Sequence, residues 1–221
     1  MKLSTFILTL KTNSRVNQSP SILRGFFAQK YSQYELLHQH KGDKKLIYSY
    51  PKVQYKIINS NPMILGIGEA VEVVKQISNI DHLDLKEKKY NVTEKRMIEK
   101  SVNFGVTKDI MSYKFLTPWL ALNEESYSRY KKRNKTEKRK QLESIIVGNI
   151  LSMSKGLEYV ITDELKAKIV DLKKIKTSLK DIPMLGFLGT FSVNFEIPDA
   201  MTCRLYQSRG FGTIERVKEL K

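Results

Sequence analysis

The order of strand-like and helix-like segments in the first hundred residues is the feature that most limits the fold of this chain. Residues 2–12 (KLSTFILTLKT) are apolar and β-branched without a helical stripe, which predicts a buried strand. Ser19-Pro20-Ser21 is typical of a helix N-terminus, and apolar residues then recur at three- and four-residue spacing up to Leu37. Gly42-Asp43 predicts the end of this helix, which would place the two nearby histidines in or just beyond its last turn.

Short strands and a second helix are expected next. In order they are strands at 46–50, 52–58 and 63–67, a helix from Gly68, and extended segments at 82–85 and 89–98. The resulting order, β-α-β-β-α-β, is that of a ferredoxin-like or RRM-like unit.

The second half of the chain has a weakly similar pattern. Its expected elements are a strand at 108–120, a long charged helix at 124–155, a segment at 161–175 that reads as a strand, an apolar strand at 184–195 and a last strand at 211–217. We therefore expect an α+β protein with antiparallel sheets and two domains. Residues 1–100 would carry the histidine pair, and residues 101–221 a basic helical region and a glycine-rich loop.

The charge of the chain indicates a polyanionic partner. Thirty-nine Lys and Arg face 23 Asp and Glu, a formal net charge of +16, and such an excess costs stability through self-repulsion. A basic solvated surface is the plainer explanation. An anionic membrane is disfavoured, because no apolar run approaches the roughly 20 residues that span a bilayer. The N-terminal MKLSTFILTLK is too short for a secretory signal and Cys203 stands alone, so we expect a cytoplasmic protein without a disulfide.

Two of the three histidines, His38 and His40, lie one residue apart. RNA cleavage by a neighbouring 2′-hydroxyl needs one proton removed from that hydroxyl and another delivered to the departing 5′-oxygen, and a pair of imidazoles could supply both. In an extended segment the two rings would share one face, and a nearby helix C-terminus would favour the protonated acid. The same pair could instead cap a helix end, lie on the solvated surface or chelate a metal. Because no cysteine and no carboxylate cluster lies near the pair beyond Asp43, we expect no metal and no cofactor.

Three further stretches could bind RNA. Tyr48 and Tyr50 would share one strand face and could stack on bases, although half-buried strand tyrosines are common. Lys52, Gln54 and Lys56 would share one face and could meet phosphate. The cationic run at 129–140 is either a solvated helix or a phosphate track. In Ser208-Arg209-Gly210-Phe211-Gly212, closely spaced glycines would let backbone N–H groups approach a phosphate, although G-x-G also occurs in ordinary turns.

Five segments in order resemble a known family. They are LHQH (37–40), YSYPKVQYKII (48–58), MILGIGEAVEVV (63–74), LGFLGTFSVNFEIPD (185–199) and SRGFG (208–212). Together they are similar to the CRISPR-associated endoribonucleases that cut repeat RNA, within the RAMP superfamily, and closest to the branch with an L-H-x-H element. The resemblance implies tandem ferredoxin-like folds. It also implies metal-independent cleavage of precursor CRISPR RNA, by 2′-hydroxyl attack, to 2′,3′-cyclic phosphate and 5′-hydroxyl ends.

The resemblance also implies roles for particular residues and partners. His38 and His40 would be the catalytic pair, Tyr48 a possible assistant, and the glycine-rich loop with its basic neighbours would hold the RNA. Such proteins often keep the guide RNA and join a multisubunit interference complex. The first half of the family's paired glycine motif falls on Thr202-Cys203-Arg204, where both glycines are missing. Side chains there would enter the RNA approach, although Arg204 could contact a phosphate. The alternative is therefore a subunit that binds repeat RNA but cuts slowly or not at all.

Overall fold

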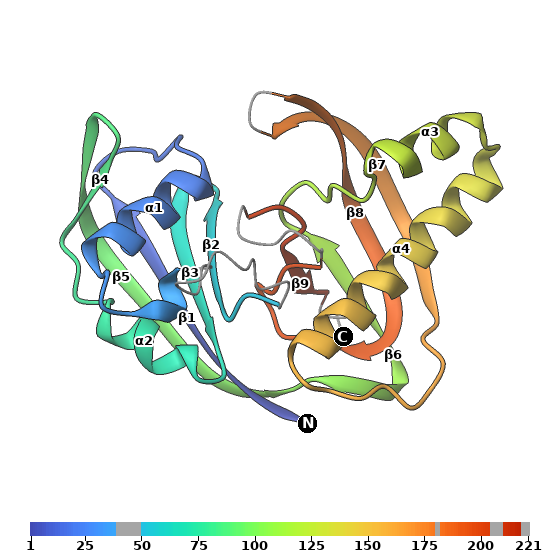
Figure 1. Ribbon diagram of the computed structural model, residues 1–221, viewed down its shortest axis with the longest axis horizontal. Coiled ribbons are helices and arrows are strands. Elements are labelled where there is room, and N and C mark those ends of the chain that lie inside the picture. The colour runs from blue at the N-terminus through green and yellow to red at the C-terminus, as the bar shows by residue number, and fades with distance from the viewer. Residues whose placement is uncertain (39–49, 180–181, 204–209, 218–221) are drawn as a thin grey trace. The chain divides into compact units, whose positions relative to one another are not determined.

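The computed structural model describes residues 1–38, 50–179, 182–203 and 210–217 (Figure 1). The described residues form two compact units. Residues 2–103 and Gly210 make up the N-terminal unit, whereas Met1 and the residues from Phe104 onward, apart from Gly210, make up the C-terminal unit. None of the described helices is long and apolar enough to cross a bilayer.

The N-terminal unit is a five-stranded antiparallel sheet with two α-helices. Its elements are β1 (Lys2–Thr12), α1 (Pro20–Lys30), the 3-10 helix η1 (Glu35–Leu37), β2 (Val53–Ile58), β3 (Asn61–Ile67), α2 (Ala70–Gln76), β4 (His82–Leu85) and β5 (Lys88–Asn103). The strand order is β2-β3-β1-β5-β4. With β4 set aside as an added edge strand, this is the ferredoxin-like order, which confirms the expected fold class.

Side chains that alternate between the two faces of the sheet build the core of this unit. Phe6, Leu8 and Leu10 of β1 point to one face of the sheet, where they join buried residues of α1 and α2. Leu23 and Phe27 are the buried residues of α1, four positions apart and so on one side of the helix. The two helices therefore cover the same face of the sheet (Figure 1).

The first helix ends earlier than its apolar spacing predicted. It begins as expected, with Pro20 in its first turn, but stops at Lys30, with Tyr31 as C-cap. The peptide N–H of Tyr34 then donates to the carbonyl of Tyr31, and η1 follows. Leu37 is buried in the same core, so the apolar repeat is satisfied by a 3-10 turn instead of a continued helix. The expected end at Gly42-Asp43 falls outside the described residues, as does nearly all of the expected strand at 46–50.

The C-terminal unit is a four-stranded antiparallel sheet with a helical hairpin. Its elements are β6 (Gly105–Phe115), α3 (Glu124–Lys132), α4 (Lys135–Gly156), β7 (Ala167–Leu179), β8 (Ile182–Glu196) and β9 (Ile214–Arg216). The order β7-β8-β6-β9 corresponds to the order β2-β3-β1-β5 of the first unit. The connection from β8 to β9, which contains the glycine-rich stretch, occupies the place in the chain order that α2 has in the first unit.

The helix expected at 124–155 is in fact two helices. Arg133 is extended, and Asn134 caps α4 by accepting from the N–H of Glu137, whose carboxylate accepts in return from the N–H of Asn134. This capping box, N-x-x-E, is a helix-start signal that the sequence does contain. The hairpin covers one face of the sheet (Figure 1), where Tyr130 of α3 meets the ring of Phe187 edge to face at 6.0 Å.

Candidate active site and nucleic-acid interface

His38 is the one member of the predicted catalytic pair that the structure describes. It follows η1, its peptide N–H donates to the carbonyl of Glu35 at 2.9 Å, and its backbone is extended (φ −104°, ψ 127°). The ring is half-buried, and its Nε2 is buried without a hydrogen-bond partner in the described part of the chain.

The position of His38 corrects one expectation. It does not lie in the last turn of α1, which ends at Lys30, but follows η1. The backbone of His38 itself is extended. His40 and Tyr48 lie outside the described residues.

The three polar residues of the β2 region differ in how far they reach solvent. Lys52 precedes β2, is partly exposed, and its ammonium lies 2.9 Å from Oε1 of Glu69. Gln54 and Lys56 share one side of β2, as alternation predicted, but both are fully buried. The ammonium of Lys56 donates to Oε1 of Gln54 at 2.8 Å, and the amide of Gln54 donates to the carbonyl of Pro51 at 3.2 Å. Burial lowers the pKa of Lys56 to about 7.

The two glycines of the C-terminal motif have structural roles of their own. Both have positive φ, +72° at Gly210 and +68° at Gly212. A Cβ at Gly210 would come within 2.7 Å of Cγ of Pro20 and 3.3 Å of the carbonyl oxygen of Tyr55. The N–H of Gly212 donates to the carbonyl of Pro118, so that N–H is already occupied within the protein. Arg204, Ser208 and Arg209 lie outside the described residues.

Of the two positions where the family's glycines are missing, 202 and 204, the structure describes the first, and its side chain is inside the C-terminal unit. Thr202 and Cys203 are fully buried, and Thr202 forms an isolated β-bridge with Thr213. The amide of Asn149 in α4 donates to the carbonyl of Cys203 at 3.1 Å. We expected side chains at positions 202 and 204 to enter the RNA approach, but Thr202 packs inward instead. Burial raises the pKa of the Cys203 thiol to about 12.

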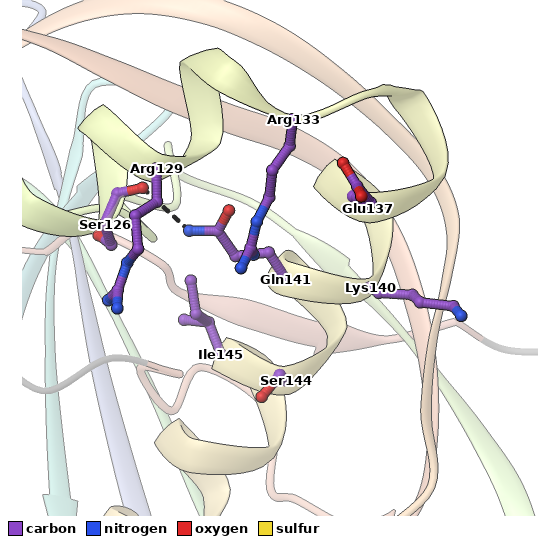
Figure 2. Close-up of a pocket in the computed structure, with 8 residues that line it drawn as sticks. All are labelled: Ser126, Arg129, Arg133, Glu137, Lys140, Gln141, Ser144 and Ile145. Carbon is purple, nitrogen blue, oxygen red and sulfur yellow. Dashed lines mark hydrogen bonds between the residues drawn. The ribbon is translucent and has the colours of Figure 1, made fainter.

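Four residues of the run at 129–140 help to line a cavity of about 510 Å³ between α3 and α4, namely Arg129, Arg133, Glu137 and Lys140 (Figure 2). Arg129 is part of α3 and Arg133 follows that helix, and the side chain of Gln141 of α4 lies between theirs. The charge of the run is visible in the sequence. Gln141 and Ser126, the polar residues beside it, carry no sequence signal of their own.

No group of three His, Cys, Asp or Glu that could hold a metal ion is found among the residues the structure describes.

Comparison with known proteins shows the family to which this chain is similar. The model of the Cas6b N-terminal domain matches residues 1–103, and that of the Cas6b C-terminal domain matches residues 105–217. A Cas6b crystal structure is 36% identical, with a TM-score of 0.90, over 98% of this chain and 100% of its own. A crystal structure of the CRISPR RNA processing endoribonuclease Cas6b is 35% identical with a TM-score of 0.77 and the same coverage. An uncharacterized protein of Methanocaldococcus jannaschii is 41% identical over 143 residues, which is 65% of this chain and 97% of that relative.

Proposed function

Because the chain belongs to the Cas6b family of CRISPR RNA processing endoribonucleases, we propose that it cleaves precursor CRISPR RNA within the repeats, without a metal ion. The two family models together cover nearly the whole chain, and the segment with His38 lies inside the first of them. The observation that carries the proposed chemistry is the half-buried ring of His38, whose Nε2 has no partner in the described part of the chain.

The reaction needs two proton transfers and one displacement. A base removes the proton of the 2′-hydroxyl, and the resulting oxygen attacks the adjacent phosphorus. The bond from phosphorus to the 5′-oxygen breaks, and an acid protonates the departing oxygen. The products are a 2′,3′-cyclic phosphate and a 5′-hydroxyl. In this proposal His38 and His40 share the roles of base and acid, and Tyr48 assists. The extended backbone at His38 favours a common face for positions 38 and 40.

RNA binding is proposed for residues of both halves of the chain. They are Lys52, Gln54, Lys56, Arg204, Ser208, Arg209, Gly210 and Gly212. Lys52 is the most accessible of the β2 group, and a phosphate would compete with its ion pair to Glu69. Gln54 and Lys56 contact RNA only if their buried hydrogen bond opens.

We further propose that the protein keeps the guide RNA after cleavage and passes it to the other subunits of an interference complex.

The deciding experiment is cleavage of the host's own repeat RNA in the presence of a chelator. The wild type should give one product with a 2′,3′-cyclic phosphate, and His38→Ala/His40→Ala should bind the RNA without cutting it. Loss of cleavage in the chelator that returns with added metal would overturn the metal-independent mechanism.

A second candidate function rests on the missing glycines at positions 202 and 204. A family member without them could retain repeat RNA and cut it slowly or not at all. The same experiment separates the two: tight binding by the wild type with no cyclic product would favour the binding subunit.

A further inference from the structure

The cavity between α3 and α4 combines positive charge with an unsatisfied acceptor. Its lining includes Ser126, Arg129, Arg133, Lys140, Gln141 and Ser144 (Figure 2). All of them but Arg133, which lies between the two helices of the hairpin, belong to α3 or α4, and the capping boxes at Asn123 and Asn134 fix the start of each helix. The cavity is therefore built by regular structure within the C-terminal unit.

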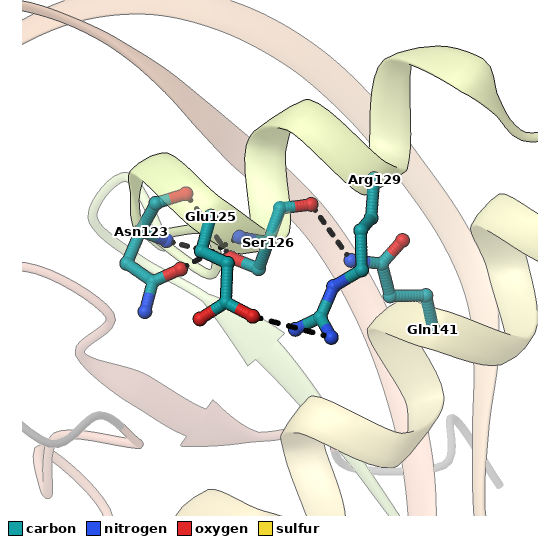
Figure 3. Close-up of polar contacts among 5 residues, drawn as sticks. All are labelled: Asn123, Glu125, Ser126, Arg129 and Gln141. Carbon is teal, nitrogen blue, oxygen red and sulfur yellow. Dashed lines mark hydrogen bonds and ion pairs between the residues drawn. The ribbon is translucent and has the colours of Figure 1, made fainter.

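The charge of the cavity is positive and poorly compensated. Its lining holds three cationic side chains, those of Arg129, Arg133 and Lys140, against the one carboxylate of Glu137. Glu137 is exposed, and its carboxylate accepts from the N–H of Asn134 at 3.0 Å. Arg129 pairs with Glu125 at 3.5 Å, but both side chains are largely exposed, so this pair is weak (Figure 3). Within the described part of the chain, Arg133 has no ion-pair partner.

Gln141 supplies a second, independent observation. Its Nε2 donates to the carbonyl oxygen of Ser126 at 2.9 Å, which bridges the two helices (Figure 3). This bond fixes the orientation of the amide, because a flipped amide would set oxygen against oxygen. The other amide atom, Oε1, is buried and has no hydrogen-bond partner in the described residues. A buried acceptor without a donor is costly, so a ligand that brings a donor would be favoured.

The RNA backbone offers both an anion for the cationic side chains and a hydrogen-bond donor for Oε1 of Gln141. Each linkage carries an anionic phosphate next to a 2′-hydroxyl that can donate a hydrogen bond. Arginine guanidinium groups suit the phosphate, because their planar donors match its oxygens. Since Gln141 lies between Arg129 and Arg133, one nucleotide could meet all three.

We propose that the α3–α4 cavity is a binding site for one nucleotide unit of RNA, separate in sequence from the histidine segment. Arg129 and Arg133 hold the phosphate, and Oε1 of Gln141 accepts from the 2′-hydroxyl. This inference rests on the proposed function, because it assigns a further contact to the same RNA-binding protein. The site contacts the phosphate and the ribose of the RNA, so its contribution to affinity is independent of base sequence.

The test uses the full chain and two fifteen-nucleotide probes, oligouridylate and its deoxy counterpart. Affinity is measured by fluorescence anisotropy at several salt concentrations. Arg129→Ala/Arg133→Ala should bind the RNA about tenfold more weakly than wild type, and its plot of log affinity against log salt should be shallower by about 0.7. Lys132→Ala/Lys135→Ala removes two exposed charges that do not line the cavity, so it is the matched control, with an expected loss of about twofold.

Gln141→Met tests the sugar contact. It should weaken binding of the RNA about threefold to tenfold and leave binding of the DNA unchanged. Unchanged DNA binding also shows that the variant is folded. Equal losses on RNA and DNA would overturn the role of the 2′-hydroxyl.

Cleavage of repeat RNA by the same proteins separates this inference from the proposed function. If the wild type cuts the repeat but the arginine variant binds like its lysine control, the inference is wrong. The cavity would then suit another occupant, such as an acidic protein segment. If the wild type does not cut, yet the arginine pair and Gln141 behave as expected, the site stands and the proposed activity fails.

Discussion

Lys56 donates a hydrogen bond of 2.8 Å to Oε1 of Gln54, and both side chains are fully buried on one side of β2. A buried ammonium with a neutral partner is an unusual arrangement, because burial disfavours the charged form. Its consequence is a pKa lowered from the ordinary value of 10.5 to about 7.

This lowered pKa should make stability depend on pH. Between about pH 7 and pH 10 the unfolded chain holds the proton of Lys56 while the folded chain has lost it, so the free energy of unfolding rises with pH. Below pH 7 both states hold the proton, and Lys56 adds no slope. The rise should approach about 1 kcal/mol per pH unit in urea denaturation, and Lys56→Met should lack it. Lys132→Met, which alters an exposed side chain, is the control and should keep the slope of the wild type.

Gly210 should tolerate no side chain, because of both its φ and its surroundings. Gly210→Ala places a residue at φ +72° and a Cβ 2.7 Å from Cγ of Pro20, which together should cost about 2–4 kcal/mol. Gly68→Ala is the matched control, since Gly68 has φ +59° and a methyl group there would meet nothing within 4 Å, and it should cost about 1 kcal/mol. Equal urea midpoints for the two variants would contradict the close approach. Pro20→Ala should recover part of the loss in a double-mutant cycle.

Much of the fold was predictable because local signals agreed with the pairing of the strands. The β-branched run at residues 2–12 and the Ser19-Pro20 helix start both gave the elements that the structure contains. The break before Asn134 was also readable, from its capping box. The end of α1 at Lys30 was not, because its apolar repeat continues unchanged into η1.

The candidate site was less predictable from sequence. A lysine that alternates with apolar residues in a strand suggests an exposed side chain, yet Lys56 is buried. Burial depends on what covers the second face of a sheet, and the period of a single strand does not carry that information. For the same reason nothing local indicated that Gly210 would lie against Pro20, or that Oε1 of Gln141 would be buried without a donor.

Glu143 should anchor α4 on the sheet of the C-terminal unit. Its Oε1 accepts from Nε of Arg139 at 3.2 Å and from the N–H of Ile169 at 3.0 Å, and Arg139 also donates to the carbonyl of Ile169. Glu143→Ala should therefore lower the free energy of unfolding by about 1–3 kcal/mol. Glu125→Ala is the control, because it breaks an exposed ion pair with Arg129, which is also four positions along its helix. It should lower the free energy of unfolding by less than about 0.5 kcal/mol. A larger loss at Glu125 than at Glu143 would show that α4 is held by other contacts.

Cys203 should be unreactive while the protein is folded. The thiol is fully buried and its pKa is raised to about 12, so at pH 8 the reactive thiolate is scarce and inaccessible. Because the chain has a single cysteine, the rate of labelling by a disulfide reagent reports this one site. Labelling at pH 8 should be at least about 100-fold slower in buffer than in denaturant. Rapid labelling of the native protein would mean that the segment at 202–203 opens readily.

His38 and His82 provide a matched pair for the proposed catalysis. His38→Ala removes a ring whose Nε2 has no partner in the described part of the chain, and it should slow repeat cleavage by about 10²–10⁴-fold with little change in RNA affinity. His82 lies in β4 with its Nε2 3.3 Å from Oδ2 of Asp84, away in sequence from the catalytic segment. His82→Ala should leave the single-turnover rate within about twofold of wild type, because it removes an imidazole that has no proposed part in the reaction. Similar losses in both variants would indicate that the histidines act through stability or general charge. A loss confined to His38 would be expected only if its ring takes part in the chemistry.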